Sequence, residues 1–172
     1  MISQDLMSEI RRVFALNLDG IHGEAHWVRV CDNGLRLAGQ TGADLEIVEL
    51  FAFLHDSKRF DNGFDRDHGR RAAGFVKTLQ GSLLSLSEEK LELLVYACAY
   101  HCDGLTEADV TVQTCWDADR LDLGRIGIRP DPRYLCTAAA KEPAMIEWAF
   151  RRSQKSLNGT RCGFAGHAGR LE

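Results

Sequence analysis

The stretch TGADLEIVELFAFLHD, residues 41–56, predicts the central helix of the fold. Its first four residues, Thr41-Gly-Ala-Asp44, have the form of a capping box, which opens a helix by satisfying free backbone N–H groups. Between Leu50 and Leu54 the segment is apolar on almost every side, as is typical of a helix surrounded by other helices. The residues expected to be buried are Ile47, Val48, Leu50, Phe51 and Leu54. The sequence therefore predicts a bundle packed around this segment.

Helical periodicity recurs on both sides of this segment, and no stretch shows the convincing alternation of a β-strand. All three prolines lie after residue 129, so none interrupts the earlier helical patterns. Further helices are expected at about residues 3–17, 22–38, 67–80, 87–102 and 106–116, and after Pro143. Residues 157–172 are glycine-rich without periodicity and are expected to form a flexible tail. The predicted fold is all-α, with one compact helical domain over residues 1–156.

Composition excludes several classes of protein. The 172 residues are 45% apolar and 27% charged, which argues against disorder or a fibrous repeat. The net charge of −4 offers no broad basic surface, so no nucleic-acid polymer is expected as a partner. No apolar run approaches the roughly 20 residues that span a bilayer, and the N-terminal residues carry charges where a signal core would be apolar. We therefore expect a cytoplasmic protein with no membrane partner. A homo-oligomer is compatible with the sequence but is not indicated by it.

The pair His55-Asp56 follows the most apolar helix of the chain. An imidazole and a carboxylate at a buried helix end are costly unless something neutralises and coordinates them. Neighbouring helix side chains diverge by about 100°, yet a long imidazole and a short carboxylate can meet on one ion that lies across the helix. The second oxygen of Asp56 would then be free to bridge to another ion.

Three ordered motifs resemble those of the HD superfamily of metal-dependent phosphohydrolases. They are His26-Trp-Val-Arg-Val, Phe53-Leu-His55-Asp56-Ser-Lys-Arg59 and Asp117-Ala-Asp119-Arg120-Leu121-Asp122, within about residues 20–127. The resemblance implies a helical bundle of the HD type. The metal ligands that it implies are His26, His55, Asp56 and Asp119.

Two further segments are similar to those of an HD subset that binds two ions. They are Asp67-His68-Gly-Arg-Arg-Ala-Ala and Ala97-Cys-Ala-Tyr-His101-Cys-Asp-Gly104. The resemblance implies that His68 and His101 hold a second ion and that Asp56 bridges the two. Four imidazoles and two carboxylates, with no well-placed thiol, suit one or two divalent ions of iron, manganese, zinc, nickel or cobalt.

The function implied is hydrolysis of a small phosphorylated molecule, with a nucleotide favoured. Two nearby ions can share a hydroxide and clamp the oxygens of a phosphoryl displacement. Asp56 and Asp119 are the expected catalytic carboxylates, and Arg59 would bind phosphate oxygens through its guanidinium fork. Two alternatives stay open: a di-iron HD-fold oxygenase with the same ligands, and a regulatory HD module that binds a nucleotide without turnover.

Several residues near these motifs have simpler structural interpretations. His22 is expected to pack at a helix N-terminus rather than to support a ligand. Asp122 is expected to pair with Arg125 on the helix surface, and Asp117 either is solvated or supports a ligand histidine. The six cysteines include no CxxC pair and are expected to be reduced and mostly buried. Cys102, next to His101, could join a metal shell, but a buried thiol is favoured. The remaining expectations are a solvated Lys58, packing roles for Trp27 and Trp116, and ordinary surface positions for Arg70, Arg71 and Arg120.

Overall fold

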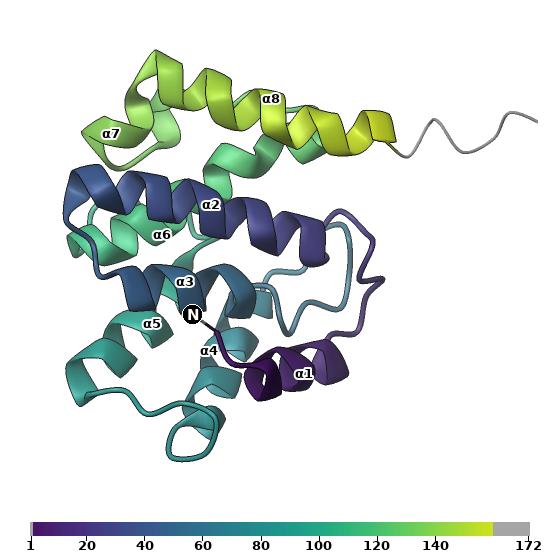
Figure 1. The fold of residues 1–172 in the computed structure, drawn as a ribbon, viewed down its shortest axis with the longest axis vertical. Helices are drawn as coiled ribbons and strands as arrows, with labels where there is room; N and C mark the ends of the chain where they lie inside the picture. The colour runs from purple at the N-terminus through teal and green to yellow at the C-terminus, as the bar shows by residue number, and fades with distance from the viewer. Residues whose placement is uncertain (1, 160–172) are drawn as a thin grey trace, which may run out of the picture.

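The computed structural model describes residues 2–159, and all regular structure in this range is helical (Figure 1). Between residues 2 and 159 there is no strand, only a single bridge between Gln80 and Leu84. The α-helices are α1 (Gln4–Val13), α2 (Glu24–Thr41), α3 (Leu45–Leu54), α4 (His68–Leu79), α5 (Glu88–Tyr100), α6 (Val110–Arg120), α7 (Ala138–Lys141) and α8 (Pro143–Gly159). Two 3₁₀ helices, η1 (Leu121–Ile126) and η2 (Pro132–Tyr134), follow α6. The prediction of an all-α, compact fold is confirmed.

Helix α3 lies at the centre of the bundle, as its sequence predicts. All residues from Leu50 to Leu54 are buried, because α2 and α6 pack on one side of α3 and α5 on another (Figure 1). Trp27 on α2 and Trp116 on α6 are fully buried in the same core, so their predicted packing roles are confirmed. Burial of this apolar surface is the main force that holds the helices together.

The start of α3 differs from the predicted capping box. Thr41 is the last residue of α2, which ends at Gly42 in the left-handed conformation with φ 76°. Asp44 is the N-cap itself, and its carboxylate accepts hydrogen bonds from the N–H groups of Glu46 and Ile47. A single capping aspartate therefore opens the helix, and the box that begins at Thr41 does not form.

Helix α6 begins and ends about four residues later than the sequence predicts. The carboxylate of Asp109 caps its start by accepting from the N–H of Thr111. The helix therefore continues to Arg120 and includes Asp117 and Asp119. Both aspartates of the third motif therefore lie on α6, which packs against α2 and α3.

Helices α4 and α5 approach each other closely at Gly69. A Cβ atom at this position would lie 2.6 Å from the carbonyl oxygen of Cys98 and 3.1 Å from the His101 ring. No larger residue fits without separating the two helices. The glycine next to His68 thus allows His68 and His101 to lie side by side.

The C-terminal part of the chain forms a second, smaller apolar cluster. Helix α8 packs on η1 and lies above α2 (Figure 1). Helix α8 begins at Pro143, as the sequence predicts, and continues to Gly159. Residues 157–159, which were expected in the tail, are therefore helical, and residues 160–172 lie outside the described part of the chain. Within residues 2–159, no helix is both long enough and apolar enough to cross a bilayer.

Candidate metal centre

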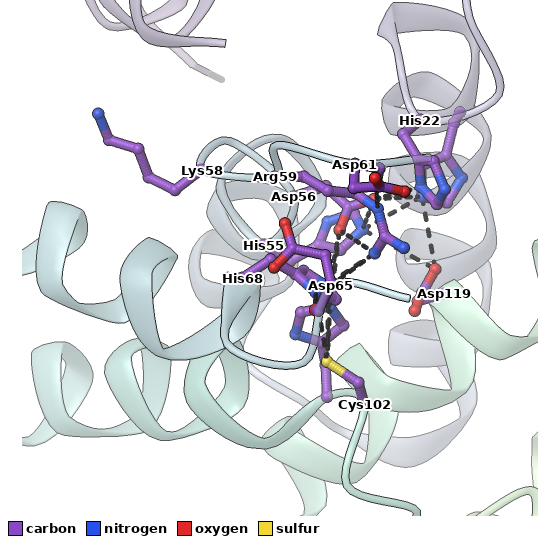
Figure 2. A network of polar contacts seen from close by, with 12 residues as sticks. His22, His55, Asp56, Lys58, Arg59, Asp61, Asp65, His68, Cys102 and Asp119 are labelled. Atoms are coloured by element: carbon purple, nitrogen blue, oxygen red, sulfur yellow. Dashed lines mark hydrogen bonds and ion pairs between the residues drawn. The ribbon is translucent and has the colours of Figure 1, made fainter. Parts of the chain in front are cut away.

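The six side chains predicted to bind metal lie together at the starts of α2 and α4 and the ends of α3, α5 and α6 (Figure 2). They are His26 in the first turn of α2, His55 and Asp56 directly after α3, His68 at the start of α4, His101 directly after α5, and Asp119 near the end of α6. All except Asp119 are buried, and the Asp119 side chain is 17% exposed. The fold therefore brings the whole predicted ligand set to one place.

One group of atoms, which we call the first half-site, consists of His26 Nε2, His55 Nε2, Asp119 Oδ1 and Asp56 Oδ2. His26 Nε2 lies 3.1 Å from His55 Nε2 and 3.4 Å from Asp119 Oδ1. Asp56 Oδ2 lies 3.7 Å from each of the two imidazole nitrogens. His55 Nε2 lies 3.8 Å from Asp119 Oδ1.

The second half-site consists of His68 Nε2, His101 Nε2 and the other oxygen of Asp56. The two imidazole nitrogens lie 2.9 Å apart. Asp56 Oδ1 lies 3.1 Å from His68 Nε2 and 3.7 Å from His101 Nε2. Asp56 thus directs one carboxylate oxygen into each half-site, in the arrangement expected of a bridging ligand.

In all four imidazoles, Nδ1 contacts an oxygen that accepts hydrogen bonds. The partners are Asp122 Oδ2 for His26, the Phe51 and Ala52 carbonyls for His55, the Asp65 carbonyl for His68 and the Cys98 carbonyl for His101. Nδ1 therefore carries the hydrogen, and Nε2 of the neutral ring presents a lone pair to the half-site. This is the tautomer that metal-binding histidines adopt when they bind through Nε2.

The spacing of these atoms fits divalent ions. The Nε2 atoms of His26 and His55 lie 3.1 Å apart, and both rings are neutral with the hydrogen on Nδ1. Their Nε2 lone pairs would therefore repel each other unless a cation lay between them. Ligand atoms about 2.0–2.1 Å from one ion are about 3.4 Å apart in a tetrahedron and about 2.9 Å apart at right angles. The His26–Asp119 and His68–Asp56 distances of 3.4 and 3.1 Å fall in this range, and the other carboxylate–imidazole distances, 3.7–3.8 Å, are slightly longer. Both groups could therefore hold a metal ion.

The two half-sites differ in protonation. Burial lowers the pKa of His55 and lowers that of His26 well below its usual value, so both rings are neutral at pH 7. Burial acts in the same direction on His68 and His101, but hydrogen bonds to Asp56 and Cys102 outweigh it. They raise the pKa of His68 to about 9 and that of His101 well above its usual value. An ion in the second half-site must therefore displace protons.

Both carboxylates that face the half-sites are ionised. Burial by itself raises the pKa of Asp56 and Asp119, but His55 and the other nearby histidines, with Arg125 in the case of Asp119, together outweigh it. The pKa of Asp56 falls well below its usual value, aided by its histidine hydrogen bonds, and that of Asp119 falls to about 2, aided by Arg125.

Asp122 contributes to the first half-site, a role that the sequence prediction missed. It was expected on the surface with Arg125 but is fully buried, with Oδ2 2.7 Å from His26 Nδ1. Arg29 donates two hydrogen bonds to its carboxylate, and Arg125 lies 4.0 Å from it. A carboxylate in this position fixes the ring of a metal-binding histidine and makes the histidine more basic.

His22 also differs from its predicted packing role. It is buried, and its Nδ1 donates a hydrogen bond to Asp56 Oδ2 over 2.8 Å. It therefore helps to orient the bridging carboxylate. The signal in the sequence was its spacing of one helical turn before His26, which does not by itself distinguish this role from packing.

Arg59 extends over the second half-site (Figure 2). Its guanidinium donates to the carbonyls of Asp61 and Gly63, and its Nη1 lies 3.0 Å from His68 Nε2 and 3.6 Å from Asp56 Oδ1. Lys58 points away from the cluster and lies over the Phe75 ring. Of these two basic residues, Arg59 is therefore the one beside the predicted ligands.

Cys102 is not the buried thiol that the sequence favoured. It is exposed, and its sulfur lies 3.4 Å from His68 Nε2 and 3.6 Å from His101 Nε2 (Figure 2). Although the residue as a whole is exposed, its sulfur contact with the rings is partly buried, and this burial by itself raises the pKa of the thiol. The hydrogen bonds from His101 and His68 outweigh it and lower the pKa to about 6. The prediction that no thiol is well placed is therefore wrong. Cys31, Cys98 and Cys115 are buried, as predicted.

The remaining polar residues of the motifs have structural roles. The Asp117 carboxylate accepts hydrogen bonds from the N–H groups of Cys136 and Thr137, so it holds the chain before α7 rather than a ligand histidine. Among the arginines, Arg70 pairs with Asp103, Arg71 with Asp65, and Arg120 with the Tyr134 and Leu105 carbonyls.

Comparison with known proteins gives no further information about the site. No protein-family model matches the sequence, and neither a curated protein nor a solved structure matches it significantly. Chemical and functional conclusions therefore depend on the geometry of the residues themselves.

Proposed function

We propose that the chain is a phosphohydrolase of the HD type that uses two divalent ions to hydrolyse a small phosphorylated molecule. The observation that carries the proposal is the division of Asp56 between the half-sites, with Oδ2 near His26 and His55 and Oδ1 near His68 and His101. A carboxylate whose two oxygens each lie beside two imidazoles can bridge two ions and hold them close together. Donor atoms of nitrogen and oxygen suit iron, manganese, zinc, nickel or cobalt.

The residues around the half-sites support phosphate as the group that binds. When bound, two such ions lower the pKa of a shared water to near neutrality and stabilise charge on the phosphoryl oxygens. Arg59 is anchored by two carbonyls and leaves Nη1 directed at the second half-site. From there it can donate hydrogen bonds to a phosphate oxygen and offset the charge that develops in the transition state.

Exposure of the ligands indicates the side from which the substrate enters. Among the six predicted ligands, the Asp119 side chain is the most exposed, at 17% against 3% for Asp56. The 59–66 loop, which begins at Arg59, also carries the exposed rings of Phe60 and Phe64. Exposed aromatic rings next to a phosphate-binding arginine suit stacking of a nucleobase, which supports a nucleotide as the substrate.

The test combines metal analysis with a substrate screen. Protein reconstituted with manganese, iron, cobalt, nickel or zinc is expected to bind two ions and to release phosphate from at least one nucleotide or phosphate ester. Oxygen uptake with a mixed-valence iron signal, and no phosphate release under nitrogen, would instead assign the oxygenase. Tight nucleotide binding without product, with every metal, would assign the regulatory module.

A further inference from the structure

The second half-site has an additional potential ligand in Cys102. Its sulfur lies 3.4 Å from His68 Nε2 and 3.6 Å from His101 Nε2. The same two nitrogens lie 3.1 and 3.7 Å from Asp56 Oδ1. Two nitrogens and one sulfur therefore lie at ligand spacing from one another, and Asp56 Oδ1 approaches the same two nitrogens.

These distances agree with ligation of a single ion. With Zn–S near 2.3 Å and Zn–N near 2.1 Å, sulfur and nitrogen on one tetrahedral zinc are about 3.6 Å apart. Because Nδ1 of each ring donates to a main-chain carbonyl, Nε2 is the ring atom that faces the half-site and can bind an ion. The sulfur thus lies at ligand spacing from the two Nε2 atoms that an ion would bind once it displaced their protons.

The local chain conformation holds the sulfur there. Cys102 follows His101, the C-cap residue of α5, and the chain then turns at Gly104 with φ 75°. On the facing helix, Gly69 permits the close approach that keeps His68 beside His101. The first half-site consists only of nitrogen and oxygen atoms, and among residues 2–159 no cysteine is grouped with them.

We propose that Cys102 binds the second ion as a thiolate, which makes this half-site selective for thiophilic ions such as zinc. The inference rests on the two-ion centre proposed above and adds a ligand to one half of it. Thiolate ligands favour zinc over manganese, whereas imidazole and carboxylate ligands accept both. The two half-sites would therefore differ in metal preference, with zinc bound more tightly than manganese at the second.

Cobalt(II) titration of the metal-free protein tests this ligand directly. A cobalt–thiolate bond gives an intense near-ultraviolet charge-transfer band, which nitrogen and oxygen ligands do not give. The wild-type protein is expected to show this band for one of its two cobalt ions. Cys102→Ser should lose the band, while Cys136→Ser should keep it, because Cys136 is a partly exposed thiol that contacts Arg120 and the Leu105 carbonyl.

Zinc affinity and thiol reactivity provide independent readouts. Cys102→Ser should weaken zinc binding to one site by on the order of tenfold or more and leave manganese binding unchanged. In wild-type protein, zinc should protect the exposed Cys102 from alkylation, which requires no substitution. Two bound ions without a charge-transfer band, or without protection of Cys102, would overturn the inference and leave the proposed function intact. A protein that binds no metal would overturn both.

Discussion

The two half-sites are built from the same bridging carboxylate but are supported in different ways. The first half-site is supported by the buried Asp122–Arg29 pair, which fixes His26, and both of its imidazoles are neutral. In the second half-site, His68 is supported by a carbonyl of the 59–66 loop and contacts Arg59. We infer that the first is organised before an ion binds and that the second is completed by the ion. The two ions should therefore bind with unequal affinity.

Loss of the bridging carboxylate should abolish both half-sites. In Asp56→Asn, the metal content should fall to less than one ion, because the amide cannot supply an anionic oxygen to each group. Loss of several kcal/mol of transition-state stabilisation corresponds to on the order of 1000-fold in turnover. Metal analysis measures the ion content, and circular dichroism checks that the variant keeps its helical fold. A matched control is Asp131→Asn, since Asp131 is a surface residue paired with Arg133. Full metal content in Asp56→Asn would contradict the bridging role.

Asp122→Asn should affect the first half-site alone. Because Asp122 orients and polarises His26, the change should weaken the tighter ion about 10- to 100-fold. The second ion, and the charge-transfer band of Cys102, should be unchanged. Isothermal titration with zinc measures the two affinities separately. If both ions weakened equally, the separate support of the half-sites would be disproved.

Arg59→Lys should affect substrate binding at the second half-site and not the metal content. Lysine keeps the charge but loses the planar fork that binds phosphate oxygens and the loop carbonyls together. The expected loss in kcat/KM is about tenfold, with two ions still bound. The control is Arg70→Lys, on an exposed arginine paired with Asp103. Equal activity of Arg59→Lys and the wild type would exclude Arg59 from phosphate binding.

The pH dependence of metal binding also distinguishes the half-sites. The pKa of His68, about 9, lies above its usual value, so its proton stabilises the metal-free fold below about pH 6.5. That contribution is lost as pH rises through 9. An ion must displace the same proton, so affinity for the second ion should rise between pH 6.5 and 9, by at most about tenfold per pH unit for this proton.

The first ion should not share this dependence. Because the pKa values of His26 and His55 are lowered, those rings have no proton to lose in that window. Titrations at several pH values therefore provide an internal control. A first ion whose affinity rose equally with pH would contradict the assigned protonation states.

Local sequence patterns predicted most of the fold and the ligand set. The nearly continuous apolar run identified α3 as the central helix, and the resemblance of ordered motifs to those of the HD superfamily selected histidines and aspartates that the fold does bring together. The start of α6 was placed too early because capping by Asp109, rather than periodicity, sets it.

The supporting residues could not be read from the sequence because they depend on how helices are rotated against each other. Asp122 lies 96 positions from His26 in the chain, and no local pattern links the two. The same holds for His22 with Asp56 and for Cys102 with His68, which are 34 positions apart in each case. Burial and exposure of these side chains follow from long-range packing.

The most direct test of the two-ion centre is anomalous X-ray diffraction from crystals of the manganese- or zinc-loaded protein. Two anomalous peaks about 3.5–4 Å apart are expected, with one oxygen of Asp56 bonded to each. A single peak, or no peak among these four histidines and two aspartates, would contradict the two-ion centre.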